Sequence, residues 1–480
     1  MKVNTINISE KKLIITVAAI AQLIQQLIAN MTIIALPNIL VDFNFPSQDI
    51  MWINLIYLTA LVAVCLPFAK IISQYGVKKC IKISTIILLI SIIISIFSMN
   101  QFMILFSRLI QGFTSASLSI CLYIMIVEGL PEDEMGPALG IVGSAGYLGM
   151  LIAPSFMGFM LHFANWRMAF LILVPIFIIL LFLLSKIKKE WATEKTEIDN
   201  IGSLLYMLSM ALFTYGMTVL DEHGIFSVII SIILVILFIR YERIHPSPIY
   251  NLSLLRDIRY VIGNYAAMIT YFTTTIAITA LTFHLQYIIK FDEYIIGLIL
   301  IISPIIMVGV SGIAGKLSNT IDPRIISSIA MSFICTSMII FFFMDSLPIE
   351  IILFGCALQG IGNGFFSAPN NKYVLTLVDE KDLPDASALL STSKEFGKIL
   401  STGIYTLIFS INIGNDTLGK DYLEPLLIKS TSQMMLINAV LAFTAIVLLL
   451  YSKYKFKLDY SEKIAKFLDT IKPNFGKKQK

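Results

Sequence analysis

Apolar residues in this 480-residue chain are concentrated in runs of about twenty, separated by short polar segments. At a helical rise of 1.5 Å per residue, such a run crosses a hydrocarbon layer ~30 Å thick. The pattern predicts an all-α membrane protein with about fourteen transmembrane helices. The expected spans are residues 13–36, 50–72, 80–98, 102–128, 137–161, 166–186, 202–220, 224–241, 261–289, 294–317, 324–344, 348–376, 384–411 and 432–452.

The seventh and eighth runs are joined by a connection of only four residues, 221–224, and predict a two-helix hairpin inserted between two six-helix halves. Residues 69–73 after the second run have a counterpart in residues 315–319 after the tenth, which indicates an internal repeat. The expected domains are an N-terminal six-helix bundle at 1–190, the inserted hairpin with its linkers at 191–255, a C-terminal six-helix bundle at 256–452 and a basic cytoplasmic tail at 453–480.

The composition agrees with a membrane protein, since 57% of residues are hydrophobic, 14% are charged and the mean hydropathy is +0.85. If the N-terminus is placed in the cytoplasm, most Lys and Arg residues fall on the cytoplasmic face, which predicts that both termini of this cell-membrane protein are cytoplasmic. This asymmetry explains the net charge of +4 without nucleic acid as a partner. The Lys-rich tail has apolar residues at helical spacing and either lies on anionic lipid or is a solvated extension.

No catalytic or cofactor-binding pattern is found. The five cysteines lie in or beside apolar runs without metal-ligand spacing, and the four histidines are scattered. The glycines of residues 360–364 follow no predicted strand, and a phosphate-binding loop with its lysine is missing from the sequence. We expect neither an enzyme, nor a cofactor, nor an ATP-driven pump.

Several short motifs occur in order along the chain. They are Asn30-Met31-Thr32 with Ala35-Leu36-Pro37, Trp52 with Tyr57, Arg108-Leu109-Ile110-Gln111-Gly112, Gly149 to Gly158 around Pro154, Asn165-Trp166-Arg167, Leu285-Gln286, and Gln359-Gly360 with Asn363-Gly364. Together they resemble the major facilitator superfamily, specifically its fourteen-helix drug:proton antiporters. The resemblance implies two bundles that rock around a central site, a multidrug efflux activity and protons as the coupling ion.

Two positions depart from the pattern of that branch. Its acidic residue in the first helix is Asn30 here, and the Asp-Arg pair of its cytoplasmic loop is replaced by Ser73-Gln74. An amide cannot supply the negative charge that favours a cationic substrate. We therefore expect cationic dyes to be poor substrates.

Polar residues form a stripe on the first helix of each predicted half. The candidate substrate cavity consists of Gln22, Gln26, Asn30, Tyr271, Thr275, Thr279, Thr282 and Gln286. Their helical spacing and the internal repeat place both stripes against one central cavity. The alternative is that the hydroxyl groups bond only to their own helix.

Ionisable residues within apolar runs are the candidates for coupling, because an intramembrane charge is costly and is retained where it acts. These candidates are Arg108, Lys394, Glu395, Lys398 and His284. If the first four share the cavity, its formal charge of +2 favours neutral or anionic substrates. The alternatives are that Arg108 only joins helices 1 and 4 and that Glu395 is neutralised within a structural cluster.

A hinge is expected in the fifth helix at Gly149, Ala153, Pro154 and Gly158, although packing alone would also explain these small residues. The predicted function is secondary active export of small lipophilic or drug-like compounds by alternating access with proton antiport. The alternatives are an importer or facilitator of a small metabolite and a non-transporting receptor. The sequence leaves the oligomeric state open.

Overall fold

The computed structural model describes residues 8–43, 50–191, 198–219, 224–413 and 424–456. All regular structure within these residues is helical. Fourteen helical segments of the described chain are long and apolar enough to cross a membrane, as the hydrophobic pattern predicts.

The first half and the hairpin contain nine helices in the described residues. They are α1 (Ile8–Phe43), α2 (Ile50–Tyr75), α3 (Val77–Ile96), α4 (Gln101–Gly129), α5 (Glu132–Phe163), α6 (Trp166–Leu171), α7 (Val174–Lys186), α8 (Asn200–Thr218) and α9 (Gly224–Glu242). The short helices α6 and α7 together form one span.

The second half continues after a short 3₁₀ helix at Leu252–Arg256. Its helices are α10 (Ile258–Phe283), extended by a π-helical turn at His284–Ile288, then α11 (Glu293–Leu300), α12 (Ile302–Leu317), α13 (Pro323–Phe342), α14 (Ile349–Leu375), α15 (Leu383–Ile413) and α16 (Glu424–Lys455). Here α11 and α12 share one span.

Most helix ends lie within a few residues of the predicted ones, and the larger differences are extensions. Helix α1 continues to Phe43 instead of Leu36, and α16 begins at Glu424, eight residues before the predicted start. Hydropathy marks only the part of a helix that crosses hydrocarbon, so it misses turns that project into the polar layer. Of the predicted tail, residues 453–455 belong to α16, and residues 457–480 lie outside the described residues.

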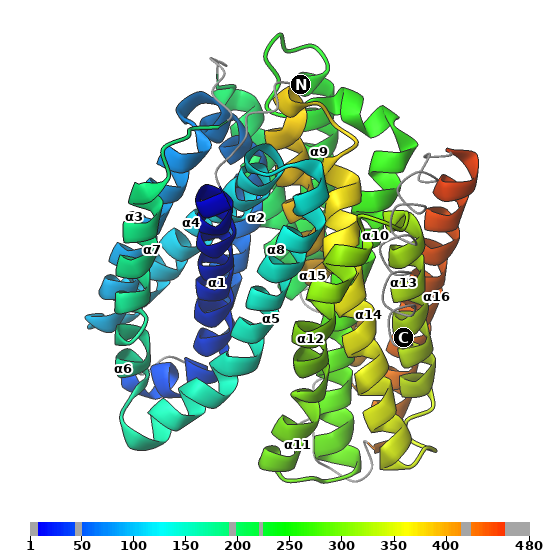
Figure 1. The fold of residues 1–480 in the computed structure, drawn as a ribbon. Coiled ribbons are helices and arrows are strands. Elements are labelled where there is room, and N and C mark those ends of the chain that lie inside the picture. The colour runs from blue at the N-terminus through cyan, green and yellow to red at the C-terminus, as the bar shows by residue number, and fades with distance from the viewer. Residues whose placement is uncertain (1–7, 44–49, 192–197, 220–223, 414–423, 457–480) are drawn as a thin grey trace, which may run out of the picture.

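The helices form two bundles, one on each side of the molecule in Figure 1. In the first, α1 packs on α5, and α4 packs on α2 and α3. In the second, α13 packs on α14 and α16, while α10 packs on α15. The predicted architecture of two six-helix bundles is confirmed, and the exact domain boundaries stay predictions.

The contact between α5 and α12 joins the two bundles over several turns. A Cβ atom on Gly140 would lie 2.7 Å from the Ser311 carbonyl oxygen, so only a glycine permits this approach. The Ser311 hydroxyl donates to the Gly140 carbonyl at 3.1 Å, and Ser144 donates to the Val308 carbonyl at 3.0 Å. Backbone proximity of this kind is how small residues hold membrane helices together.

The second contact between bundles joins α2 to α15. Near the end of α2, the Lys70 ammonium lies 3.3 Å from the Asp385 carboxylate at the start of α15. Each contact therefore pairs the second helix of one half with the fifth helix of the other. This symmetry agrees with the internal repeat at residues 69–73 and 315–319.

The hairpin α8–α9 packs at the seam between the bundles rather than beside either one. Helix α8 contacts both α2 and α15. The Tyr206 hydroxyl donates to the Val62 carbonyl of α2 at 3.1 Å and lies 3.4 Å from the Thr392 hydroxyl of α15. The insertion thus covers the α2–α15 contact from outside.

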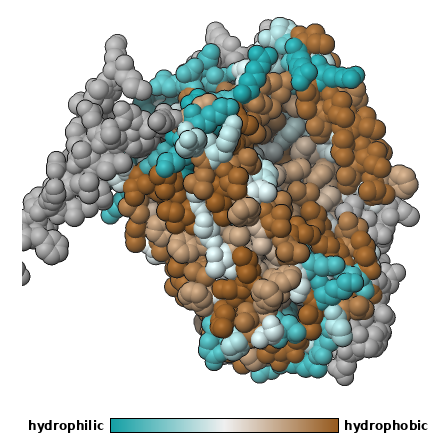
Figure 2. Space-filling model, turned by 90° about the vertical axis from the view of Figure 1, so that its right-hand side faces the viewer, coloured by the Kyte–Doolittle hydropathy of each residue, from teal (hydrophilic) through white to brown (hydrophobic). Residues whose placement is uncertain are grey.

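The two bundles diverge toward the end of the molecule where α5 and α10 finish, and they meet at the end where α2 finishes and α15 begins (Figure 1). Figure 2 shows a broad hydrophobic band with hydrophilic residues gathered above and below it. Helix α9 contributes exposed apolar side chains, including Phe226, Ile229 and Ile233. Such a band is what a lipid-facing surface requires.

The Lys70–Asp385 pair predicts a stability test. Lys70→Ala leaves a buried carboxylate without its cation, and breaking a buried pair from one side costs about 3–5 kcal/mol. We expect a clear drop in the thermal unfolding midpoint of the purified protein. The double variant Lys70→Ala/Asp385→Asn, which removes both charges, should recover most of it. An unchanged unfolding midpoint for Lys70→Ala would show that the pair does not stabilise the contact between the two bundles.

Candidate functional site

A cluster of ionisable and aromatic side chains lies between the two bundles. Its residues belong to α15 and α10 of one bundle and to α4 of the other. Helix α15 contributes Lys394, Glu395 and Lys398, at spacings that place Lys394 and Lys398 on the same face of the helix. Helix α10 contributes Tyr271, whose ring centre lies 5.8 Å from the Lys394 nitrogen and 5.3 Å from the Lys398 nitrogen. The structure thus brings together four of the residues that the sequence predicts.

Lys394 is the buried cation of this cluster, with a relative exposure of 6%. Its ammonium donates to the Tyr123 hydroxyl of α4 at 2.6 Å and to the Asn371 amide oxygen of α14 at 2.9 Å. Both acceptors are neutral, and Tyr123 belongs to the opposite bundle. Lys394 therefore places a formally cationic side chain at the interface and joins the two bundles.

Glu395 is paired with Lys398, as the i, i+3 spacing predicts. The Lys398 ammonium lies 2.8 and 3.0 Å from the two carboxylate oxygens. Because this pair cancels its own charge, the local balance is +1 from Lys394 rather than the +2 expected when Arg108 is counted.

Arg108 lies elsewhere, within the N-terminal bundle, at 1% exposure. It donates to the Ile53 carbonyl at 3.1 Å, to the Thr32 hydroxyl at 3.2 Å and to the Gln111 side chain at 2.8 Å. Its guanidinium also stacks over the Tyr57 ring, with the central carbon 4.3 Å from the ring centre. The side chain joins α1, α2 and α4, which favours the structural alternative, and its role in coupling stays a prediction.

The stripe on α1 lies mainly against α5. A Cβ atom on Gly146 would lie 3.2 Å from the Gln22 side chain, and one on Gly149 would lie 2.8 Å from the Gln26 Cβ. The Asn30 amide donates to the Gln26 carbonyl at 2.8 Å. All three polar side chains remain half-buried, so they are not sealed within the bundle.

The threonines of α10 bond back to their own helix. Thr275, Thr279 and Thr282 each donate to the carbonyl four residues earlier, at 2.9, 3.0 and 2.7 Å. Their hydroxyl protons are thus engaged, and only the oxygen lone pairs are available to a ligand. These bonds agree with the alternative hypothesis that the hydroxyl groups of this stripe bond only to their own helix.

His284 and Gln286 lie in the π-helical turn that ends the α10 span. His284 is buried at 1% exposure, and its Nδ1 has no hydrogen-bond partner among the described residues. Thirteen residues separate it from Tyr271, roughly 20 Å at the rise of an α-helix. It is therefore remote from the lysine cluster.

The predicted hinge residues lie in an unbroken helix, because α5 continues through Pro154 to Phe163. Gly149 and Ala153 are buried, whereas a Cβ atom on Gly158 would have no neighbour within 4 Å. Close packing thus accounts for Gly149 and Ala153 but not for Gly158. Hinge motion stays a prediction.

The sequence analysis missed Tyr123 and Asn371 as partners of Lys394, and Asp385 as a buried carboxylate of the α15 span. The signal for Asn371 was present, because Asn370, Asn371 and Lys372 interrupt an otherwise apolar stretch. Tyr123 gave no signal, since tyrosine is common in membrane helices. Among the described residues, no cluster of three or more His, Cys, Asp or Glu residues could hold a metal ion.

Two helical bundles with an inserted hairpin and a polar cluster between them define a multi-pass membrane transporter. The chain matches the Major Facilitator Superfamily over residues 18–241 and 263–475, and it belongs to that family.

Relatives with known names share about a quarter of their residues with this chain. The riboflavin transporter RibZ of Clostridioides difficile is 24% identical over 92% of this chain and 97% of its own length. The drug efflux pump JefA of Mycobacterium tuberculosis is 23% identical, over 80% of this chain and 78% of its own length.

Solved structures agree with the fold. The human organic anion transporter MFSD10 superposes with a TM-score of 0.67 at 12% identity, covering 92% of this chain and 99% of its own. The proton:xylose symporter XylE superposes with a TM-score of 0.64 at 14% identity, covering 94% and 96%. At such identities the likeness shows the fold alone.

The contacts of Arg108 predict a loss of stability as well as of transport. Arg108→Ala removes three hydrogen bonds worth about 1 kcal/mol each, so the unfolding midpoint and the flux should both fall. Arg259→Ala is the control, because Arg259 is partly exposed beside Asp257, and such pairs contribute only about 0–1 kcal/mol. If Arg108→Ala abolishes flux with an unchanged midpoint, its role is functional rather than structural.

Proposed function

We propose that this chain is a secondary active exporter of small lipophilic or drug-like compounds, neutral or anionic, and that it works by alternating access with proton antiport. The preference for neutral or anionic substrates rests on Lys394. This formally cationic side chain is buried between the bundles, and both of its hydrogen-bond acceptors are neutral. In a low-dielectric site, one such charge attracts anions and repels cations far more strongly than it does in water. Asn30 adds no opposing negative charge.

The packing between the bundles supports alternating access. The end where the bundles meet is held by glycine contacts, single hydrogen bonds and the Lys70–Asp385 pair. All of these contacts can break without unfolding either bundle. The pseudo-symmetric arrangement of α2–α15 and α5–α12 lets one bundle rock against the other around the cluster.

The Glu395–Lys398 pair is our candidate for proton coupling. Protonation of Glu395 would cancel its charge and release the Lys398 ammonium toward the substrate. Among the relatives, the drug efflux pump supports export by analogy, and the riboflavin transporter supports transport of a small molecule. We place both termini in the cytoplasm and the protein in the cell membrane, on the distribution of Lys and Arg.

The decisive experiment is uphill flux in proteoliposomes under an imposed pH gradient. The panel contains matched organic anions, neutral compounds and cations. Substrate-dependent proton movement with preference for anions or neutral compounds is expected. Flux down a gradient without proton movement would favour the facilitator alternative, and specific binding without any flux would favour a receptor.

Lys394→Gln tests the selection of substrate charge. Glutamine keeps amide donors for Tyr123 and Asn371 but removes the positive charge. We expect the flux of organic anions to fall by about tenfold, which corresponds to about 1.4 kcal/mol, with little change for neutral compounds. Lys429→Gln, at an exposed position of α16, is the control. Equal losses for all charge classes would argue against this role.

Glu395→Gln tests the coupling step. The substitution keeps the shape of the side chain and removes the carboxylate that we propose accepts the coupling proton. Flux should then no longer respond to the pH gradient, while exchange of substrate across the membrane continues. Glu424→Gln is the control, because Glu424 pairs with Lys290 at a more exposed place. A normal response to the gradient in Glu395→Gln would move coupling to another group, with His284 the next to test.

A further inference from the structure

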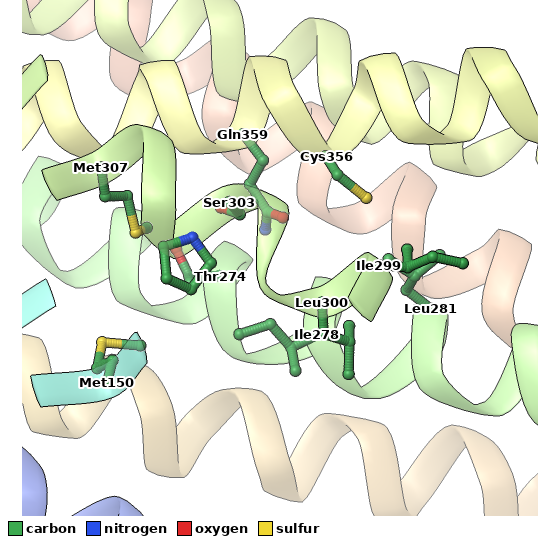
Figure 3. A pocket seen from close by; sticks show the side chains of 11 residues that line it. Met150, Thr274, Ile278, Leu281, Ile299, Leu300, Ser303, Met307, Cys356 and Gln359 are labelled. Atoms are coloured by element: carbon green, nitrogen blue, oxygen red, sulfur yellow. The ribbon is translucent and has the colours of Figure 1, made fainter. Parts of the chain in front are cut away.

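A small pocket in the C-terminal bundle lies apart from the lysine cluster and opens toward α5. Its walls come from α10, α11, α12 and α14, and Met150 of α5 faces it from the opposite bundle (Figure 3). The lining residues are Met150, Thr274, Ile278, Leu281, Ile299, Leu300, Ser303, Pro304, Met307, Cys356 and Gln359. A molecule held here would contact both bundles.

Gln359 is the polar group that projects into this apolar pocket. Figure 3 shows its amide extending from α14 toward Thr274 and Leu300 on the facing walls. The residue is 3% exposed, and its Nε2 has no hydrogen-bond partner among the described residues. Leaving a buried donor unpaired costs about 1–3 kcal/mol, so an acceptor from a ligand or from water is required there.

Asn363 repeats this feature one turn farther along α14. It is also 3% exposed, and its Nδ2 likewise has no partner in the described chain. Its Oδ1 lies 2.9 Å from the Thr274 hydroxyl, which also donates to the Thr270 carbonyl at 2.7 Å. Residues four apart on a helix are neighbours at about 5–6 Å between their Cβ atoms. Two amide groups therefore occupy one face of α14, and Gln359 is the one that lines the pocket.

The chemistry of a matching ligand follows from the Gln359 amide, a hydrogen-bond donor surrounded by apolar side chains. Neutral carbonyl oxygens satisfy amide N–H groups, whereas a charged group would lose its hydration among Ile278, Leu300 and Met307 without gaining an opposite charge. Methionine sulfur makes favourable contacts with aromatic rings, and Met150 and Met307 both line this pocket. The donors thus select an uncharged, carbonyl-bearing edge on an otherwise apolar body.

We propose that the Gln359 pocket is a substrate subsite for the carbonyl-bearing edge of a flat, otherwise apolar ring system. This inference rests on the proposed function, because it assigns part of the transported compound to a pocket that both bundles border. Gln359 and Asn371 are twelve residues apart on α14, about 18 Å along the helix axis. The subsite is therefore distinct from the place where Lys394 selects charge.

Equilibrium binding of two matched ligands tests the subsite without requiring transport. Anthraquinone-2-sulfonate and anthracene-2-sulfonate share three rings and a sulfonate, and only the former carries carbonyl oxygens. The sulfonate contributes equally to both, so it cancels in the ratio of dissociation constants. For the full chain in lipid nanodiscs, we expect the quinone to bind at least about fivefold more tightly, as one or two net hydrogen bonds imply.

Gln359→Met retains the length of the side chain and removes the donor, so the preference for the quinone should fall to about one, with binding of the anthracene compound retained. Gln359→Leu, which also lacks the donor and adds no charge, should behave likewise if the methionine variant is poorly folded. Met307→Leu is the control on the apolar wall and should change both affinities together, which leaves their ratio unaltered.

The subsite is overturned if wild type does not discriminate between the two ligands, if it binds neither, or if Gln359→Met keeps the discrimination. Failure of the proposed function gives a different result. In that case the quinone preference and its loss in Gln359→Met are observed in nanodiscs, while proteoliposomes show no flux driven by the pH gradient.

Discussion

The close approach of α5 to α12 is the contact on which the arrangement of the bundles depends. Gly140 faces the Ser311 carbonyl with no room for a side chain, and single hydroxyl-to-carbonyl bonds complete the contact. In hydrocarbon there is no hydrophobic force between two apolar helices, so backbone proximity and hydrogen bonds must hold them. Such a contact is strong enough to close one end and has few bonds to break when that end opens.

The polar residues of the interior differ in the partners that they have among the described residues. Arg108 is bonded to three helices of one bundle, and the threonines of α10 are bonded to their own backbone. Lys394 joins the bundles through neutral oxygens, and the Gln359 amide nitrogen has no partner among the described residues. The bonds of Arg108 hold three helices of one bundle together, whereas Lys394 and Gln359 belong to the selection of a substrate that we propose.

The inserted hairpin gives the family's two-bundle plan an additional element at its seam. Because α8 contacts α2 and α15, it covers a contact that any rocking motion must change. Tyr206 lies within hydrogen-bonding distance of both helices. The hairpin is thus placed to stabilise the closed end of this transporter in a way that twelve helices alone could not.

The sequence by itself determined the number and approximate position of the spans, because crossing hydrocarbon requires about twenty apolar residues wherever the helix packs. It also determined the Glu395–Lys398 pair, whose spacing along one helix is local. Only the tertiary structure decided that Arg108 bonds within the N-terminal bundle, that His284 is remote from the lysine cluster, and that Tyr123 and Asn371 are the partners of Lys394. Those outcomes depend on which helix faces are brought together, and residues far apart in the chain leave no periodic signal of their contact.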